Sequence, residues 1–266
     1  MSLLVSAAVA YVGAFVLLLG EVVLKRHWRR ATLVLGWVGL VLHGAAIATL
    51  WLAVGHGPII TRYENLSSYA WATAVIALIT ITRRRSLKPL GLFLLPLSFI
   101  LLGIAAYAGP EVANMPPTFR GVWLVVHVVL YFSAFGAAAV AVSASMFVAL
   151  PAAVRSMHMA WVPEADELDL VAYRYGGAAF ALWGAGMLAG SVWAYSAWGR
   201  YWGWDPIETW SLVTWLVLGV YLHLRRFFAW SGRRAAVLLV IAFALVLVSL
   251  FGTALVSDSI HSVYFS

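Results

Sequence analysis

Long apolar stretches separated by short polar loops dominate the pattern of this chain. A membrane-spanning helix needs about 20 mainly apolar residues, and eight segments meet that requirement. They cover residues 3–25, 31–54, 66–82, 88–109, 121–150, 174–195, 209–229 and 235–256. The pattern therefore predicts an all-α fold, a polytopic transmembrane helical bundle with about eight spans. Because little remains outside the spans except short loops and one acidic stretch, we expect a single integral membrane domain over residues 1–266.

The composition supports this interpretation and excludes several other classes of protein. Hydrophobic residues make up 64% of the chain and charged residues 10%, whereas soluble domains average about 45–50% and 25%. The absence of cysteine excludes disulfide scaffolds, cysteine-ligated zinc or iron–sulfur sites, and thiol catalysis by this chain. The net charge of +7 lies in short clusters beside the spans, so it does not indicate nucleic-acid binding.

Basic residues favour one set of alternating loops. Fourteen of the seventeen Lys and Arg residues fall after the first, third, fifth and seventh spans. Cytoplasmic loops carry such an excess of positive charge, so we expect both termini on the extracytoplasmic side of the lipid bilayer. The first span has no basic residue before it and does not resemble a cleaved signal peptide.

Tryptophans crowd the outward loop between the sixth and seventh spans, which we place at residues 196–210, and its flanks. Six of the fourteen lie within 23 residues, namely Trp193, Trp198, Trp202, Trp204, Trp210 and Trp215. One interpretation is an aromatic belt, because indole rings accumulate at the membrane–water interface. Their density in one loop, and the glycine spacers Gly199 and Gly203, instead favour a flat apolar surface for a large planar ligand. Glycine lets the backbone lie close to such a surface.

The acidic residues of this loop have a structural interpretation. Asp205 directly precedes Pro206, the order expected of an N-cap residue and the first helical position. Glu208 then occupies the third position, which completes the pattern of a capping box. We therefore expect Asp205 and Glu208 to cap the seventh span rather than to act as catalysts.

Histidines occur at two depths of the predicted bundle. His127 lies about 9 Å inside the fifth span at 1.5 Å per residue, and His261 follows the last span on the same outward side. Together they could supply both axial ligands of a haem iron. His223 lies about 21 Å into the seventh span, so it would need a second, deeper site, for which His43 in the second span is the in-chain candidate partner. A histidine within a span suggests function, although an interhelical hydrogen bond explains any single one equally well.

These residues resemble the signature of a known family. The segment reads Trp198-Gly199-x-x-Trp202-x-Trp204-Asp205-Pro206-x-Glu208-Thr209-Trp210 and runs on through Trp215 to His223 and Arg225. It resembles the WWD signature of CcsA/ResC, the polytopic subunits of system II cytochrome c biogenesis, in the haem-handling group that includes CcmC and CcmF. Residues 55–65, 169–176 and 260–264 resemble further blocks of that family, the last with Val263 inserted between Ser and Tyr.

The resemblance implies two haem sites. In that family the WWD loop holds haem on the extracytoplasmic side between two flanking histidines, which match His127 and His261. The loop residues that would bind the haem are then Trp193, Trp198, Trp202, Trp204, Asp205 and Trp210. A transmembrane histidine of an inner haem site matches His223, and a CcsB/ResB subunit usually supplies its partner ligand. That leaves His43 open between a haem contact and a structural histidine.

The implied function is the transfer of haem b across the membrane and its presentation to the Cys-x-x-Cys-His segments of apocytochrome c. The chain would be part of a haem lyase complex in the bacterial inner membrane or the thylakoid membrane. Proximity of substrate thiols and haem vinyl groups would be its main catalytic contribution, with no general acid or base. Alternatives are a CcmC-like haem exporter without synthase activity, a b-type cytochrome, and an aromatic-rich transporter without haem.

Overall fold

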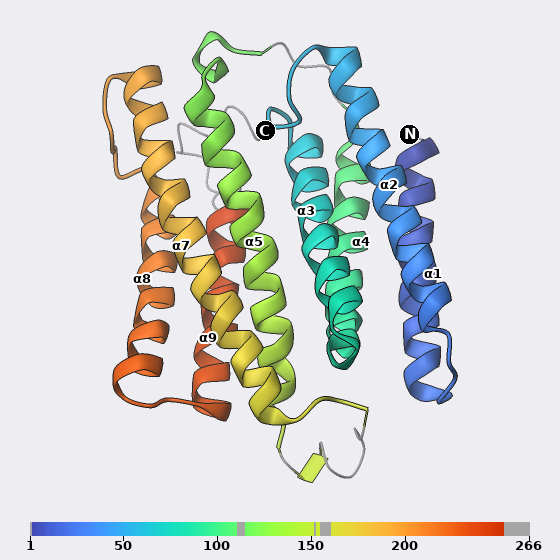
Figure 1. Ribbon diagram of the computed structural model, residues 1–266. Helices are drawn as coiled ribbons and strands as arrows, with labels where there is room; N and C mark the ends of the chain where they lie inside the picture. The colour runs from blue at the N-terminus through green and yellow to red at the C-terminus, as the bar shows by residue number, and fades with distance from the viewer. Residues whose placement is uncertain (1, 111–114, 152, 155–160, 253–266) are drawn as a thin grey trace. The chain divides into compact units, whose positions relative to one another are not determined.

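Helices form the architecture that the sequence predicts. The computed structural model describes residues 2–110, 115–151, 153–154 and 161–252. Within these ranges there is no strand, and eight helices are long and apolar enough to cross a membrane (Figure 1). Their bounds are α1 Ser2–Val23, α2 Arg29–Val54, α3 Arg62–Arg83, η1 Arg85–Leu90 with α4 Gly91–Ala108, α5 Val122–Ala149, α7 Ala165–Trp198, α8 Pro206–Phe227, and α9 Gly232–Leu247 with η3 Val248–Gly252. The prediction of an all-α fold with eight spans is confirmed.

The helices group into two compact units. The first contains α1 to α4, with α1 packed against α2 and α4, and α3 packed against the same two helices. The second contains α5 and α7 to α9, with α7 packed along α5, and α9 packed against α5 and α8. His127 and His223 belong to the second unit and His43 to the first. The assignment of one domain to the whole chain stays a prediction.

Glycines allow α5 and α7 to approach closely. A Cβ atom at Gly186 of α7 would lie 2.6 Å from the Tyr131 ring, and one at Gly190 would lie 2.4 Å from Nδ1 of His127. Both separations are far below van der Waals contact, so only glycine lets these two rings rest against the α7 backbone. His127 and Tyr131 are four residues apart on α5, as are the two glycines on α7, so each pair lies on one helix face.

The start of α7 differs from the prediction. Hydropathy placed the sixth span at residues 174–195, with the acidic stretch outside it, whereas α7 begins at Ala165. Asp166 and Glu167 occupy its first turn, where carboxylates interact favourably with the positive end of the helix dipole. A helix can therefore include polar residues that a hydropathy window excludes.

The end of α7 shortens the tryptophan-rich loop. The sequence-based interpretation placed this loop at residues 196–210, but α7 continues to Trp198 and α8 begins at Pro206. Gly199 ends α7 in a left-handed conformation with a φ of 73°, and its N–H donates to the carbonyl of Tyr195 at 2.9 Å. Only residues 199–205 are loop, so four of the six tryptophans lie in α7 or α8.

Candidate functional site: an aromatic pocket around His127

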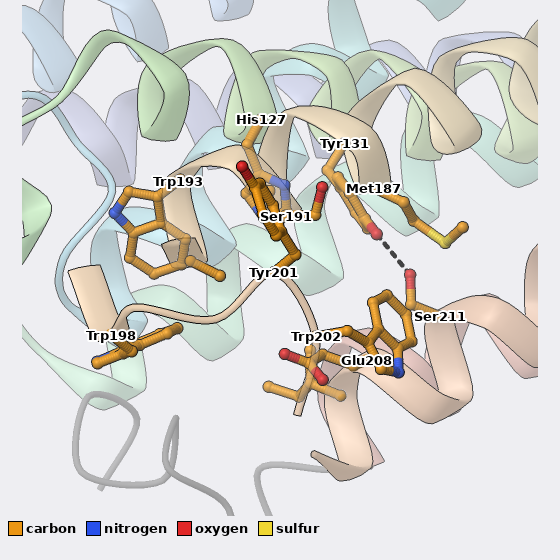
Figure 2. Close-up of a pocket in the computed structure, with 13 residues that line it drawn as sticks. His127, Tyr131, Met187, Ser191, Trp193, Trp198, Tyr201, Trp202, Glu208 and Ser211 are labelled. Carbon is orange, nitrogen blue, oxygen red and sulfur yellow. Dashed lines mark hydrogen bonds between the residues drawn. The ribbon is translucent and has the colours of Figure 1, made fainter. Parts of the chain in front are cut away.

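A pocket opens where the end of α7, the loop at residues 199–205 and the start of α8 meet α5 (Figure 2). Its cavity volume is about 60 Å³, below the range of about 300–1,000 Å³ typical of small-molecule sites, so a large ligand would need the lining side chains to move apart. The larger side chains that line it are His127, Tyr131, Met187, Trp193, Trp198, Tyr201, Trp202 and Glu208. The fold thus brings His127 together with three of the tryptophans that the sequence assigned to the same site.

His127 is held in one orientation by α7. Its Nδ1 lies 2.8 Å from the carbonyl oxygen of Gly186, and because a carbonyl only accepts, Nδ1 carries the proton. The lone pair of the neutral imidazole is therefore on Nε2. Metal-ligating histidines are commonly oriented in this way, with the second nitrogen bonded to a carbonyl. The ring also packs against Tyr131, with centroids 4.7 Å apart, and lies nearly parallel to the ring of Trp193.

A buried hydrogen-bonded cluster joins α5, α7 and α8 beside His127. The hydroxyl groups of Tyr131 and Ser211 form a hydrogen bond, drawn dashed in Figure 2. Trp183 of α7 donates its indole N–H to Oγ of Ser211 at 2.9 Å, and both residues are at most 2% exposed. Sequence reasoning missed this cluster, because its only signal is a few polar groups within apolar spans.

Three tryptophans supply the aromatic wall of the pocket. Trp193 donates its indole N–H to the carbonyl of Thr118 at 2.8 Å, which anchors the end of α7 to η2, Pro117–Phe119. Its ring meets Trp198 edge-on, with centroids 4.9 Å apart. Trp202 comes from the loop, and its Nε1 is buried with no hydrogen-bond partner among the described residues. These rings place large apolar surfaces around the imidazole of His127.

The other tryptophans of the cluster lie elsewhere. Trp204 and Trp210 are 68% and 40% exposed, and neither lines the pocket. Trp215 stacks on Phe180 of α7, with nearly parallel rings and centroids 4.9 Å apart. The flat surface expected over the whole cluster is therefore divided between a pocket wall, an exposed rim and a helix contact.

The capping box predicted at the start of α8 is confirmed. Asp205 accepts a hydrogen bond from the backbone N–H two residues further on at 3.0 Å, and Glu208 accepts one from the N–H of Asp205 at 3.2 Å. Glu208 also accepts from the N–H of Gly203 at 2.7 Å, a bond that sequence reasoning missed. This carboxylate therefore holds both the helix start and the loop, including Trp204 in a left-handed conformation with a φ of 57°.

His223 lies in a second pocket, nearer the start of α7 and the end of α8. This pocket has a cavity volume of about 550 Å³, and aromatic and basic side chains of the two helices line it. From Ser211, in the first pocket, to His223 the helix advances about 18 Å at 1.5 Å per residue. His223 and His127 therefore belong to separate pockets, as their depths in the sequence indicated.

Two further candidate histidines do not line either pocket among the described residues. His43 is fully buried in α2, with its Nε2 3.0 Å from the hydroxyl of Ser67 and its Nδ1 3.4 Å from the hydroxyl of Tyr11. Both ring nitrogens thus have neighbours on α3 and α1, which favours a structural role. His261 lies outside the described residues.

Comparisons with known proteins agree with the resemblance seen in the sequence. The model of the family described as cytochrome C assembly protein matches residues 59–261. The cytochrome c biogenesis protein CcsA of Chlamydomonas reinhardtii is 31% identical over 219 residues, which cover 80% of this chain and 62% of that protein. CcsA of Synechococcus elongatus is 30% identical over 284 residues, covering 86% of each chain. This chain therefore spans less than two thirds of the algal relative and most of the cyanobacterial one.

A solved structure shares the fold. The cytochrome c haem lyase CcmF superposes with a TM-score of 0.72 at 17% sequence identity, covering 94% of this chain and 45% of that one. The family model covers most of the chain, and the eight apolar helices make the chain an integral membrane protein. The chain therefore belongs to the cytochrome c assembly protein family, and its relatives include the CcsA proteins of cytochrome c biogenesis.

Proposed function

We propose that this chain carries haem across the membrane and presents it for covalent attachment to apocytochrome c. Membership of a cytochrome c assembly family supports the reaction class. The observation that carries the site is the hydrogen bond of 2.8 Å from His127 to Gly186, within a pocket walled by tryptophans. That bond leaves the lone pair on Nε2, the type of donor that holds haem iron.

The chemical character of the pocket lining matches that of an iron porphyrin. The ligand is broad, flat and mostly apolar, and Trp193, Trp198 and Trp202 offer ring surfaces of matching character. His127 would bind one axial position of the iron, and His261 would supply the other nitrogen. Trp204 and Trp210 would extend the aromatic surface as its exposed rim.

The chain would contribute positioning to the attachment step. The substrate supplies the cysteine thiols and haem supplies the vinyl groups, so no thiol of this chain is needed. The carboxylates of Asp205 and Glu208 accept backbone hydrogen bonds, which supports a capping role and not an acid–base role. Holding the reacting groups close together is a sufficient source of rate enhancement.

His223 would serve an earlier stage of the path. Its separate pocket on α7 and α8 would hold haem before it reaches His127, with a CcsB/ResB-type membrane subunit supplying a second ligand. The pocket around His127 would face the extracytoplasmic side of a bacterial inner membrane or a thylakoid membrane. The expected excess of basic residues on cytoplasmic loops supports this orientation.

The absorption spectrum of the purified chain tests haem binding at His127. We expect a haem Soret band, and we expect His127→Gly to weaken haem binding about tenfold or more, a change of about 1.4 kcal/mol or more. Added imidazole should restore binding by entering the space of the missing ring. His27→Gly is the matched control, since His27 is exposed and lines neither pocket. Unchanged haem affinity in His127→Gly would contradict the proposed site.

Co-expression tests the attachment function. The chain, a CcsB/ResB-type subunit and an apocytochrome c should together yield covalently bound haem, which remains with the cytochrome after denaturation. The chain with haem bound but without thioether formation would instead indicate the CcmC-like exporter.

A further inference from the structure

Two arginines line the same pocket as His223. Arg174 comes from α7 and Arg226 from α8, and no acidic residue is among the described residues that line the pocket. Arg226 follows His223 by three residues, so it lies on the same side of α8 and about 4.5 Å closer to the helix end. The pocket thus combines an imidazole with two positive charges.

The neighbouring Arg225 forms an ion pair with a carboxylate of α7. Arg225 Nη1 lies 2.6 Å from Oδ2 of Asp169, and its guanidinium lies 5.0 Å from the centre of the Tyr173 ring. Among the described ion pairs, none involves Arg174 or Arg226. Arg174 and Arg226 therefore bring positive charge to the pocket. This charge favours an anionic ligand.

The remainder of the pocket is apolar and hollow. Phe180 of α7 and Phe227 of α8 line it, and the Phe227 ring lies 4.8 Å from the His223 ring. Gly177 and Gly219 line the space between the helices without side chains. A ligand that satisfies this pocket needs a flat apolar body, a group that binds imidazole, and negative charge at one edge.

We propose that Arg174 and Arg226 bind the two propionates of the haem that His223 receives. This inference rests on the proposed function and adds the orientation of the haem at the inner site. The propionate edge lies toward the end of α8, and the opposite edge, which carries the vinyl groups, lies toward the pocket of His127. Haem therefore moves toward the outer pocket with its reactive edge leading.

Haem and its dimethyl ester provide a direct test, because esterification removes both negative charges and leaves the iron and the ring intact. The titration uses the full chain in the His127→Ala background, so that binding reports on the pocket of His223. We expect the chain to bind haem about tenfold or more tighter than the ester, as charge-assisted hydrogen bonds to two carboxylates require. Equal affinity for the two compounds overturns the proposal. If neither this variant nor the native chain binds haem, the proposed function fails as well.

Substitutions of the two arginines test whether they cause the preference for haem over its ester. Arg174→Gln with Arg226→Gln should abolish the preference for haem over the ester, and Arg174→Lys with Arg226→Lys should retain part of it. The matched control is Arg233→Gln with Arg234→Gln, which removes the same charge from exposed positions at the start of α9. A preference that survives in the double glutamine variant overturns the proposal, and circular dichroism of each variant verifies that it is folded.

An anionic lipid headgroup is the competing occupant, because basic pockets at the cytoplasmic ends of helices bind such lipids. Vesicles of phosphatidylglycerol and of phosphatidylcholine distinguish the two. Loss of phosphatidylglycerol binding in the double glutamine variant, with unchanged discrimination between haem and its ester, would assign the arginines to lipid and overturn the proposal. Unchanged lipid binding with lost discrimination supports it.

Discussion

The orientation of His127 is set by glycines on the neighbouring helix. The sequence identifies His127 as a candidate because an ionisable residue within an apolar span stands out. It does not identify Gly186 and Gly190, since glycine recurs throughout the chain and its role depends on what lies opposite. Those two positions decide that the ring rests on α7 with Nδ1 on a carbonyl.

Gly190→Ala should therefore displace His127. The added methyl group would lie 2.4 Å from Nδ1, and overpacking of this kind destabilises by about 1–3 kcal/mol. We expect weaker haem binding at His127 and a lower free energy of unfolding, measured by haem titration and thermal unfolding in detergent. Gly103→Ala is the control, because a Cβ there meets nothing within 4 Å. Equal haem affinities in the two variants would contradict this role of Gly190.

His43→Ala should act on stability and not on haem. The substitution leaves Ser67 and Tyr11 without their imidazole partner in a buried position, which destabilises by about 1–3 kcal/mol. Thermal unfolding measures the loss, and the haem spectrum of the same sample should be unchanged. A lost haem signal with unchanged stability would assign His43 to a haem site instead.

At the scale of elements, a helix start that carries a capping box follows from the sequence better than the full extent of a helix does. The capping box of α8 involves only Asp205, Glu208 and adjacent backbone, so its pattern is legible in consecutive residues. The extension of α7 to Trp198 was missed because hydropathy detects the apolar part of a helix and not its polar ends. Trp193 and Trp198 are consequently part of α7, and the helix holds them more firmly than a loop would.

Glu208→Ala should loosen this element. The carboxylate accepts from the N–H groups of Gly203 and Asp205, and loss of a cap costs about 0.5–2 kcal/mol. We expect faster hydrogen exchange in residues 199–205 and weaker haem binding, since Trp202 loses its support. Asp166→Ala provides the comparison, because Asp166 also lies in a first helical turn but on exposed surface. If both variants bind haem like the native chain, the loop does not depend on Glu208.

At the scale of the whole molecule, the distribution of basic residues sets the expected orientation in the membrane. The two ends of α8 carry different chemistry, with the tryptophan loop before it and Arg225 and Arg226 in its last turn. A helix of 22 residues is about 33 Å long, enough to place these ends on opposite faces of a bilayer.

Thiol labelling measures this orientation. The chain contains no cysteine, so Tyr201→Cys and Ser231→Cys each introduce a single thiol at an exposed position. A membrane-impermeant maleimide added to intact spheroplasts should label Tyr201→Cys and should reach Ser231→Cys only after permeabilisation. The reverse pattern would invert the proposed topology.

The sequence by itself determined the class of protein, the number of spans, the family and the capping box. These depend on composition, on apolar runs and on residues within one helical turn, all of which are local properties. Only the tertiary structure decided which tryptophans line the pocket and which nitrogen of His127 carries the proton. It alone also revealed that Arg174 accompanies His223. The bond from His127 to Gly186 joins residues 59 positions apart, and such contacts arise only when two helix faces meet.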